Sequence, residues 1–78
     1  MPTVFRSGPY RFFFFSMDGS EPPHVHMSRD DRSAKLWLDA ARPEENSGFA
    51  TVELNRIAKL TDNNAHLLLK AWNEFFSR

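Results

Sequence analysis

The chain has 78 residues, enough for one small domain with a single core, and no cysteine, so disulfide bonds are excluded. A domain of this size buries only about 60% of its unfolded surface, so a bound metal or association into a homodimer or larger homo-oligomer would add stability. Ten basic and ten acidic side chains cancel, which argues against a strong electrostatic field for nucleic acid.

The first half of the chain has the pattern of β-strands. The aromatic run at residues 10–16 suits a strand packed on both faces, and residues 24–28 alternate polar and apolar with a period of two. Gly8-Pro9, the turn-rich residues 17–23 and the charged residues 29–32 separate the strands. We therefore predict three or four antiparallel strands, at residues 3–6, 10–16, 24–28 and 33–39.

The second half changes to helical periodicity after a predicted loop at residues 40–48, where Pro43 argues against a continuous strand. A short helix is predicted from Ala50 or Thr51, with Glu53 in its first turn. A second helix is predicted to start within residues 61–64, which offer several capping side chains. The apolar stripe of this second helix is the clearest periodic signal in the chain and comprises Ala65, Leu68, Leu69, Trp72, Phe75 and Phe76.

These elements predict an α+β fold, in which a three- or four-stranded antiparallel sheet is packed by two C-terminal helices. Residues 1–78 are expected to form this one domain. The longest apolar run, residues 12–15, is too short for a signal peptide or a membrane span. We therefore expect a cytoplasmic protein that does not contact a membrane.

Five segments in order give the chain a resemblance to a known family. They are Tyr-Arg-Phe-Phe-Phe at 10–14, Glu-Pro-Pro-His-Val-His at 21–26, Ala-Lys-Leu-Trp-Leu-Asp at 34–39, Asn-Ser-Gly-Phe at 46–49 and Ala-Trp-Asn-Glu-Phe-Phe at 71–76. Together they resemble the DUF4160 family of small bacterial proteins, for which no function is established. One departure is Ala50, a poor helix N-cap where the family usually has a hydroxyl or similar cap, and Thr51 is expected to replace it.

The resemblance also implies a genetic context, because genes of this family often lie beside a gene for a DUF2442 protein. It implies an interaction component of a two-gene toxin–antitoxin-like or regulatory module, with a DUF2442-type protein as the partner. On this basis we expect the chain to act by binding rather than as an enzyme.

The residues with the chemistry for a functional site are His24 and His26. Two residues apart on a strand, they share one face with Cα atoms about 7 Å apart, a spacing that suits two ligands of one divalent metal such as Zn²⁺. A third ligand is needed, and the candidates are Asp39, Asp18, Glu21 and His66. The structural alternative is that one histidine packs against an aromatic ring and the other hydrogen-bonds a neighbouring strand or the Pro22-Pro23 turn.

An enzymatic alternative uses the same histidines as general base and acid in RNA cleavage, or as ligands in a metal-dependent hydrolase. Arg11 and Lys35 are the candidate residues for stabilising the negative charge that develops in the reaction. The strand pattern allows both cations to share the histidine face with aromatic rings, and such a face suits single-stranded RNA. Alternatively, the aromatic residues Phe13, Phe15 and Trp37 of this face bury against a second subunit.

Overall fold

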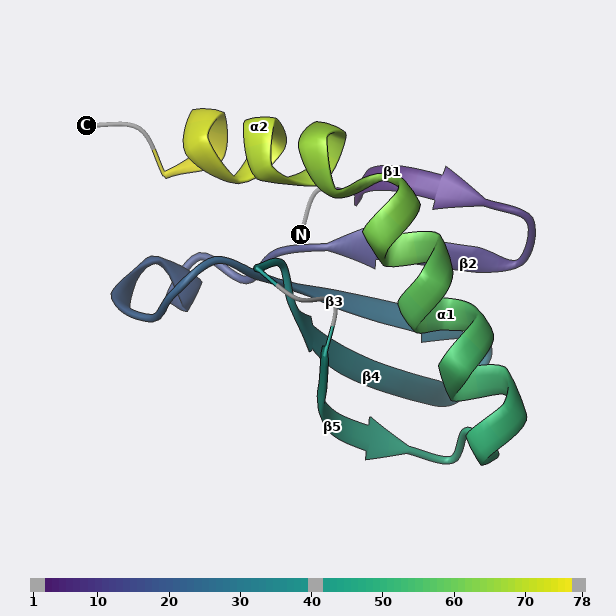
Figure 1. Ribbon diagram of the computed structural model, residues 1–78. Coiled ribbons are helices and arrows are strands. Elements are labelled where there is room, and N and C mark those ends of the chain that lie inside the picture. The colour runs from purple at the N-terminus through teal and green to yellow at the C-terminus, as the bar shows by residue number, and fades with distance from the viewer. Residues whose placement is uncertain (1–2, 40–41, 77–78) are drawn as a thin grey trace.

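A computed structural model describes residues 3–39 and 42–76 and shows a sheet followed by two helices (Figure 1). Five antiparallel strands lie side by side in chain order: β1 (Thr3–Ser7), β2 (Tyr10–Phe13), β3 (His24–Arg29), β4 (Arg32–Trp37) and β5 (Arg42–Ser47). A single 3₁₀ turn, η1 (Asp18–Ser20), lies between β2 and β3. The helices α1 (Thr51–Asn63) and α2 (Ala65–Phe75) follow. The predicted α+β fold, with an antiparallel sheet and two C-terminal helices, is confirmed.

The core lies between the helices and one face of the sheet. Alternate residues of β2, β3 and β4 point toward this face, so Phe12, Val25, Met27 and Leu36 have no exposed surface. The helices contribute three further buried side chains to the same cluster, Ile57, Leu68 and Trp72, and Phe49, just before α1, contributes a fourth. The opposite face of the sheet carries the residues between these core positions.

The fifth strand corrects the prediction of a loop at residues 40–48. Residues 42–47 pair with β4 despite Pro43, because β5 is an edge strand that pairs on one side only. Proline lacks a backbone N–H, and on the unpaired side of an edge strand no such donor is needed. The register shifts between Lys35 and Leu36, and Leu36 is the partner of Pro43. The strand therefore includes Pro43 next to an irregularity in the pairing and does not end there.

The helix boundaries also differ from those predicted. Helix α1 extends to Asn63, because Thr61 is buried within it and donates its hydroxyl to the Ile57 carbonyl at 2.9 Å instead of capping a new helix. In α2, Leu68 and Trp72 are buried as predicted, but Leu69 and Phe75 are about two-fifths exposed. Within the described ranges, neither helix has the length and apolar character needed to cross a membrane.

One ion-pair cluster joins the sheet to the start of α1. Arg29 donates to both carboxylate oxygens of Glu53, at 2.8 and 2.9 Å, and the Tyr10 hydroxyl donates to the same carboxylate at 2.8 Å. The Arg29 guanidinium, followed by the Tyr10 hydroxyl, holds the pKa of Glu53 below its ordinary value of 4.5. The ionised carboxylate thus fastens the first turn of α1 to β2 and β3.

The N-cap of α1 gives the first testable prediction. Ala50 occupies this position with extended backbone angles, no side chain caps the helix, and Thr51 does not replace the cap as predicted. Because a serine hydroxyl can accept a hydrogen bond from a free N–H of the first turn, Ala50→Ser should raise the free energy of unfolding by about 1 kcal/mol. Urea denaturation of both proteins measures the change. If the serine gave no stabilisation, the free N–H groups of the first turn of α1 would already have other hydrogen-bond partners.

The Glu53 cluster predicts a dependence of stability on pH. The folded state binds a proton at Glu53 less readily than the unfolded state, so the contribution of Glu53 is present above pH 4.5 and is lost as the pH falls through the lower pKa of the folded state. Glu53→Gln should therefore destabilise the protein at neutral pH and have less effect at about pH 3. Urea denaturation at both pH values is the measurement. An equal effect at the two pH values would contradict a role for the ionised carboxylate.

Candidate metal centre

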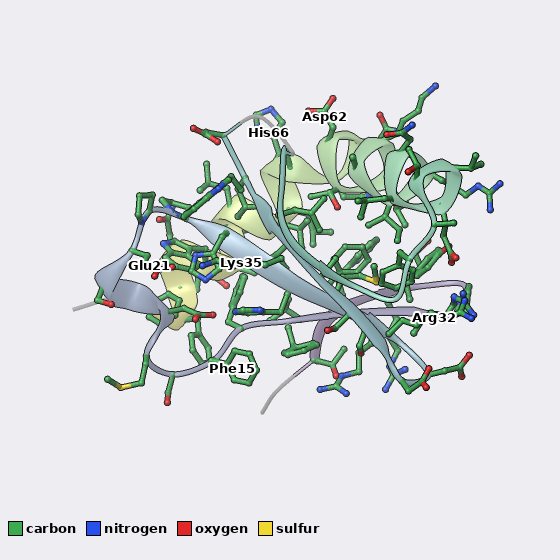
Figure 2. All side chains as sticks on the ribbon, turned by 90° about the horizontal axis from the view of Figure 1, so that it is seen from below. Phe15, Glu21, Arg32, Lys35, Asp62 and His66 are labelled. Atoms are coloured by element: carbon green, nitrogen blue, oxygen red, sulfur yellow. The ribbon has the colours of Figure 1, made fainter. Side chains whose placement is uncertain are left out.

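The two histidines of β3 lie on the sheet face opposite the core. Cross-strand pairing places Phe13, His26 and Lys35 in one row across β2, β3 and β4, and His24 opposite Trp37 in the next row. Directly paired residues of antiparallel strands point to the same face. The expectation that the histidines share a face with aromatic and cationic side chains is confirmed. Figure 2 views the molecule from below and shows Lys35 and Glu21 close together on this side.

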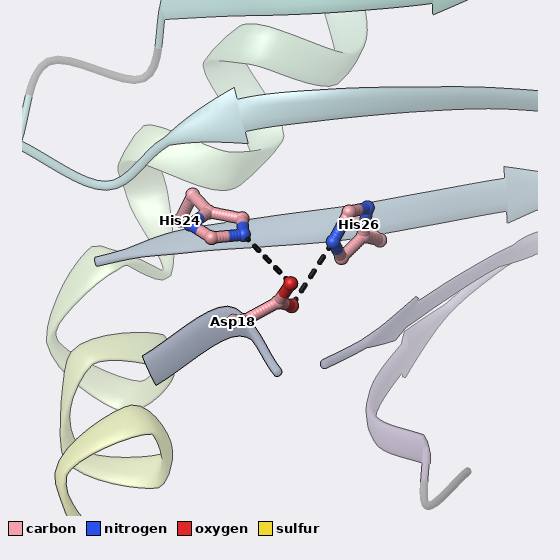
Figure 3. A group of neighbouring side chains, drawn as sticks. All are labelled: Asp18, His24 and His26. Atoms are coloured by element: carbon pink, nitrogen blue, oxygen red, sulfur yellow. Dashed lines mark ion pairs between the residues drawn. The ribbon is translucent and has the colours of Figure 1, made fainter. Parts of the chain in front are cut away.

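The connector between β2 and β3 brings Asp18 to the histidines. The backbone N–H of Phe15 donates to Asp18 Oδ2 at 2.8 Å, which holds the carboxylate against its own loop. The next residue, Gly19, packs so closely on Phe76 that a Cβ atom would lie 2.7 Å from the ring carbon Cδ1. Contact with the end of α2 thus fixes the η1 turn, and Asp18 faces both imidazoles (Figure 3).

The three side chains form a compact and largely buried group. Nε2 of His24 lies 3.2 Å from Asp18 Oδ1, and Nε2 of His26 lies 3.0 Å from Oδ2. Side-chain exposure is 0% for His24, 12% for Asp18 and 17% for His26. Both Nε2 atoms are buried and neither makes a hydrogen bond, although each is close to a carboxylate oxygen. Buried polar atoms normally have a partner, so these two nitrogens require an explanation.

The other ring nitrogen of His24 determines what Nε2 can do. Nδ1 lies 2.9 Å from the Pro22 carbonyl oxygen, which can only accept a hydrogen bond, so the proton belongs on Nδ1. A neutral His24 then presents an unprotonated Nε2, with its lone pair, to the Asp18 carboxylate 3.2 Å away. Two electron-rich atoms at this distance repel one another unless a cation lies between them.

The surroundings of the other two groups favour a neutral imidazole and an ionised carboxylate. Burial lowers the pKa of His26 below 6.5, and this effect outweighs the opposing effect of the Asp18 carboxylate. Burial alone would raise the pKa of Asp18, but the Phe15 N–H and the two imidazoles hold it below 3.8. Neutral imidazole and ionised carboxylate are the forms in which these side chains bind metals.

Of the four predicted candidates for a third ligand, the structure brings Asp18 to the histidines. Glu21 approaches the opposite side of the His24 ring, 3.8 Å from Nδ1, and bonds Lys35 Nζ at 2.8 Å. Asp39 and His66 are exposed and lie outside the group. Among the side chains that the structure describes, which leave out those of residues 40–47, Asp18, His24 and His26 are the one set of three such groups with ligand atoms within 4.8 Å of one another.

The predicted catalytic cations, Arg11 and Lys35, lie on the same sheet face as the two histidines but are not members of the ligand group. The Arg11 guanidinium lies 4.5 Å above the Phe13 ring, and Lys35 Nζ lies 5.0 Å above the Trp37 ring as well as bonding Glu21. His24 has no exposed surface with which to touch a substrate. The arrangement therefore favours the ligand role of the histidines over their action as a metal-independent acid and base.

Aromatic rings enclose the group on several sides, and sequence patterns did not predict these contacts in detail. Phe15 lies edge-on to His26 with ring centroids 4.5 Å apart, and Trp72 of α2 lies 5.2 Å from His24. The predicted structural contacts, an aromatic neighbour and a bond to the Pro22-Pro23 turn, are thus both present at His24. They fix the orientation of the ring in which Nε2 faces Asp18.

The comparisons with known proteins support the family resemblance. The model of the family described as "Domain of unknown function (DUF4160)" matches residues 10–73. Comparison with curated proteins and with solved structures gave no match. The matched segment runs from β2 to α2 and includes Asp18, His24 and His26. The chain therefore belongs to the DUF4160 family.

Proposed function

We propose that the protein binds one divalent transition-metal ion through Asp18 Oδ, His24 Nε2 and His26 Nε2. The observation that carries this proposal is the hydrogen bond from His24 Nδ1 to the Pro22 carbonyl, which leaves Nε2 unprotonated and aimed at the carboxylate. Histidines that bind metals usually donate their second ring N–H to a carbonyl or carboxylate in this way.

The distances within the group agree with this proposal. Metal–ligand bonds of about 2.0–2.2 Å at a tetrahedral centre place neighbouring ligand atoms about 3.3 Å apart. The two nitrogen–oxygen separations, 3.2 Å to Oδ1 and 3.0 Å to Oδ2, are close to that value. One ligand atom from each of the three residues lies within 4.8 Å of the others, so small side-chain movements would bring all three to one ion. Two imidazoles and one carboxylate suit Zn²⁺, Fe²⁺ or Ni²⁺ better than the oxygen-seeking Mg²⁺ or Ca²⁺.

A proton on His24 Nε2 is the competing way to relieve the repulsion. It would create an imidazolium with no exposed surface, at a cost in desolvation that a single carboxylate must offset. The contact between Nε2 and Asp18 also lacks the geometry of a hydrogen bond. These two features favour a metal ion over a second proton.

The same site supports the alternative of a metal-dependent hydrolase. Zinc sites with three protein ligands leave a coordination position for water, whereas structural sites have four protein ligands. A metal held by these residues would supply Lewis-acid activation of water. Metal binding is therefore the primary proposal. Hydrolysis depends on it, because it would use the coordination position that the three protein ligands leave open.

Calorimetric titration with zinc chloride tests the metal site on protein purified without a histidine tag. We expect one ion per chain, and at least a tenfold loss of affinity in Asp18→Asn, which keeps the shape of the side chain but removes its charge. His66→Gln is the matched control, because His66 is exposed on α2 and outside the group. Absence of binding, or equal losses in both variants, would contradict the proposal.

We propose as a second function that the protein is the interaction component of a two-gene toxin–antitoxin-like or regulatory module. The family resemblance is the source of this idea, and a DUF2442-type protein is the proposed partner. One surface feature favours it: Met17 is 80% exposed, and Phe15 and Phe75 nearby are 39% and 38% exposed. Met17 and Phe75 line a shallow depression beside the metal site, together with Ser16, Gly19, Ser20 and Phe76.

Co-purification with a DUF2442-type partner encoded beside the gene tests this second function. Met17→Glu should abolish co-purification, because it places a charge in the apolar contact. Val52→Glu is the control, since Val52 is 72% exposed but lies on α1, away from the depression. Retention of the partner by Met17→Glu, or its loss from both variants, would contradict the assignment of this surface.

A further inference from the structure

Two arginines of the first hairpin lie side by side on the sheet face that carries the metal site. Arg6 of β1 pairs directly with Arg11 of β2, while the neighbouring pair of Phe5 and Phe12 faces the core with rings 5.4 Å apart. Because side chains alternate along a strand, Arg6 and Arg11 point to the opposite face. Like charges placed directly opposite one another destabilise a sheet.

The surrounding charges do not relieve this repulsion. The cations Arg29, Arg32 and Lys35 of β3 and β4 each have a carboxylate within 4.0 Å. Neither Arg6 nor Arg11 has such a partner in the part of the chain that the structure describes. The Arg11 Nε atom is buried and makes no hydrogen bond. An arginine pair with unused donors is suited to an oxyanion, because guanidinium binds phosphate through paired N–H groups.

The position of Arg11 relates this anion site to the metal site. Its guanidinium stacks on Phe13, and Phe13 in turn stacks on His26 with ring centroids 5.7 Å apart. Arg11 pairs with Ser28, two residues along β3 from His26, so the two rows are about 7 Å apart at Cα. One nucleotide of an extended chain spans a distance of this order.

The remaining features of the face fit a nucleic-acid strand. The ring of Phe15, 39% exposed beside His26, offers a surface on which a base can stack. The Glu21 carboxylate is paired with Lys35, and a bound metal would neutralise Asp18. With these two negative charges compensated, Arg6 and Arg11 make the β1–β2 end of the face attractive to a polyanion despite the net charge of zero on the whole chain.

We propose that Arg6 and Arg11 bind a backbone phosphate of a single-stranded nucleic acid and hold the strand across the metal site. The presence of the metal beside the strand rests on the proposed function, whereas phosphate binding by the arginines does not. A phosphodiester is then the substrate class for the hydrolase alternative.

Fluorescence anisotropy with a short labelled oligouridylate tests the proposal, first in EDTA and then with zinc. We expect wild-type binding that weakens with salt, and a loss of roughly tenfold in Arg11→Ala, the size expected for one charged hydrogen-bonding group. The slope of log affinity against log salt should fall by about 0.7 for each lost phosphate contact. Arg11→Lys should bind with intermediate affinity, because it keeps the charge but loses the planar pair of donors.

The matched control is Lys59→Ala, which removes the same charge from an exposed position on α1. Equal weakening by Lys59→Ala and Arg11→Ala, or no binding of the oligonucleotide in either condition, would overturn the proposal. Competition by inorganic phosphate at the concentration of oligonucleotide phosphates would also overturn it, since a free anion and not a strand would then be the ligand. Zinc titration of Arg11→Ala should remain as in wild type, which separates a failure of this site from a failure of the metal site.

Discussion

The hydrogen bond from His24 Nδ1 to the Pro22 carbonyl is the constraint on which the proposed site depends. It spans two residues, so the local chain path into β3 determines which ring nitrogen remains available. Contacts with Trp37 and Trp72 then prevent the buried ring from turning away. As a result Nε2 faces the Asp18 carboxylate without a proton, and the metal ion that we propose would relieve the repulsion between the two atoms.

The sequence was sufficient for the fold class and for two of the three proposed ligands. The strand period of two predicted that His24 and His26 share one face, and the helical period predicted that Leu68 and Trp72 lie on the buried side of α2. The third ligand required the path of a ten-residue connector, because the position of Asp18 depends on the contact of η1 with the end of α2. Periodicity within single elements does not contain such information about contacts between distant segments.

Two errors in the predicted elements have similar physical causes. Pro43 disfavours a central strand, but β5 is at the edge of the sheet, a position that depends on strand order. Thr61 has the chemistry of a cap, yet it is buried and bonds back to Ile57, so α1 continues to Asn63. In both cases tertiary position decided between two local structures that the residue type allows.

The central claim is the identity of the cation between Asp18 and the two histidines. A crystal structure of zinc-soaked protein, with anomalous data on both sides of the zinc absorption edge, tests it most directly. We expect one strong anomalous peak about 2.0–2.2 Å from Asp18 Oδ and from both Nε2 atoms, with the His24 Nδ1 bond to Pro22 retained. A map with no peak there, and with His24 Nε2 in a linear hydrogen bond to the carboxylate, would show that the cation is a proton and would contradict the account.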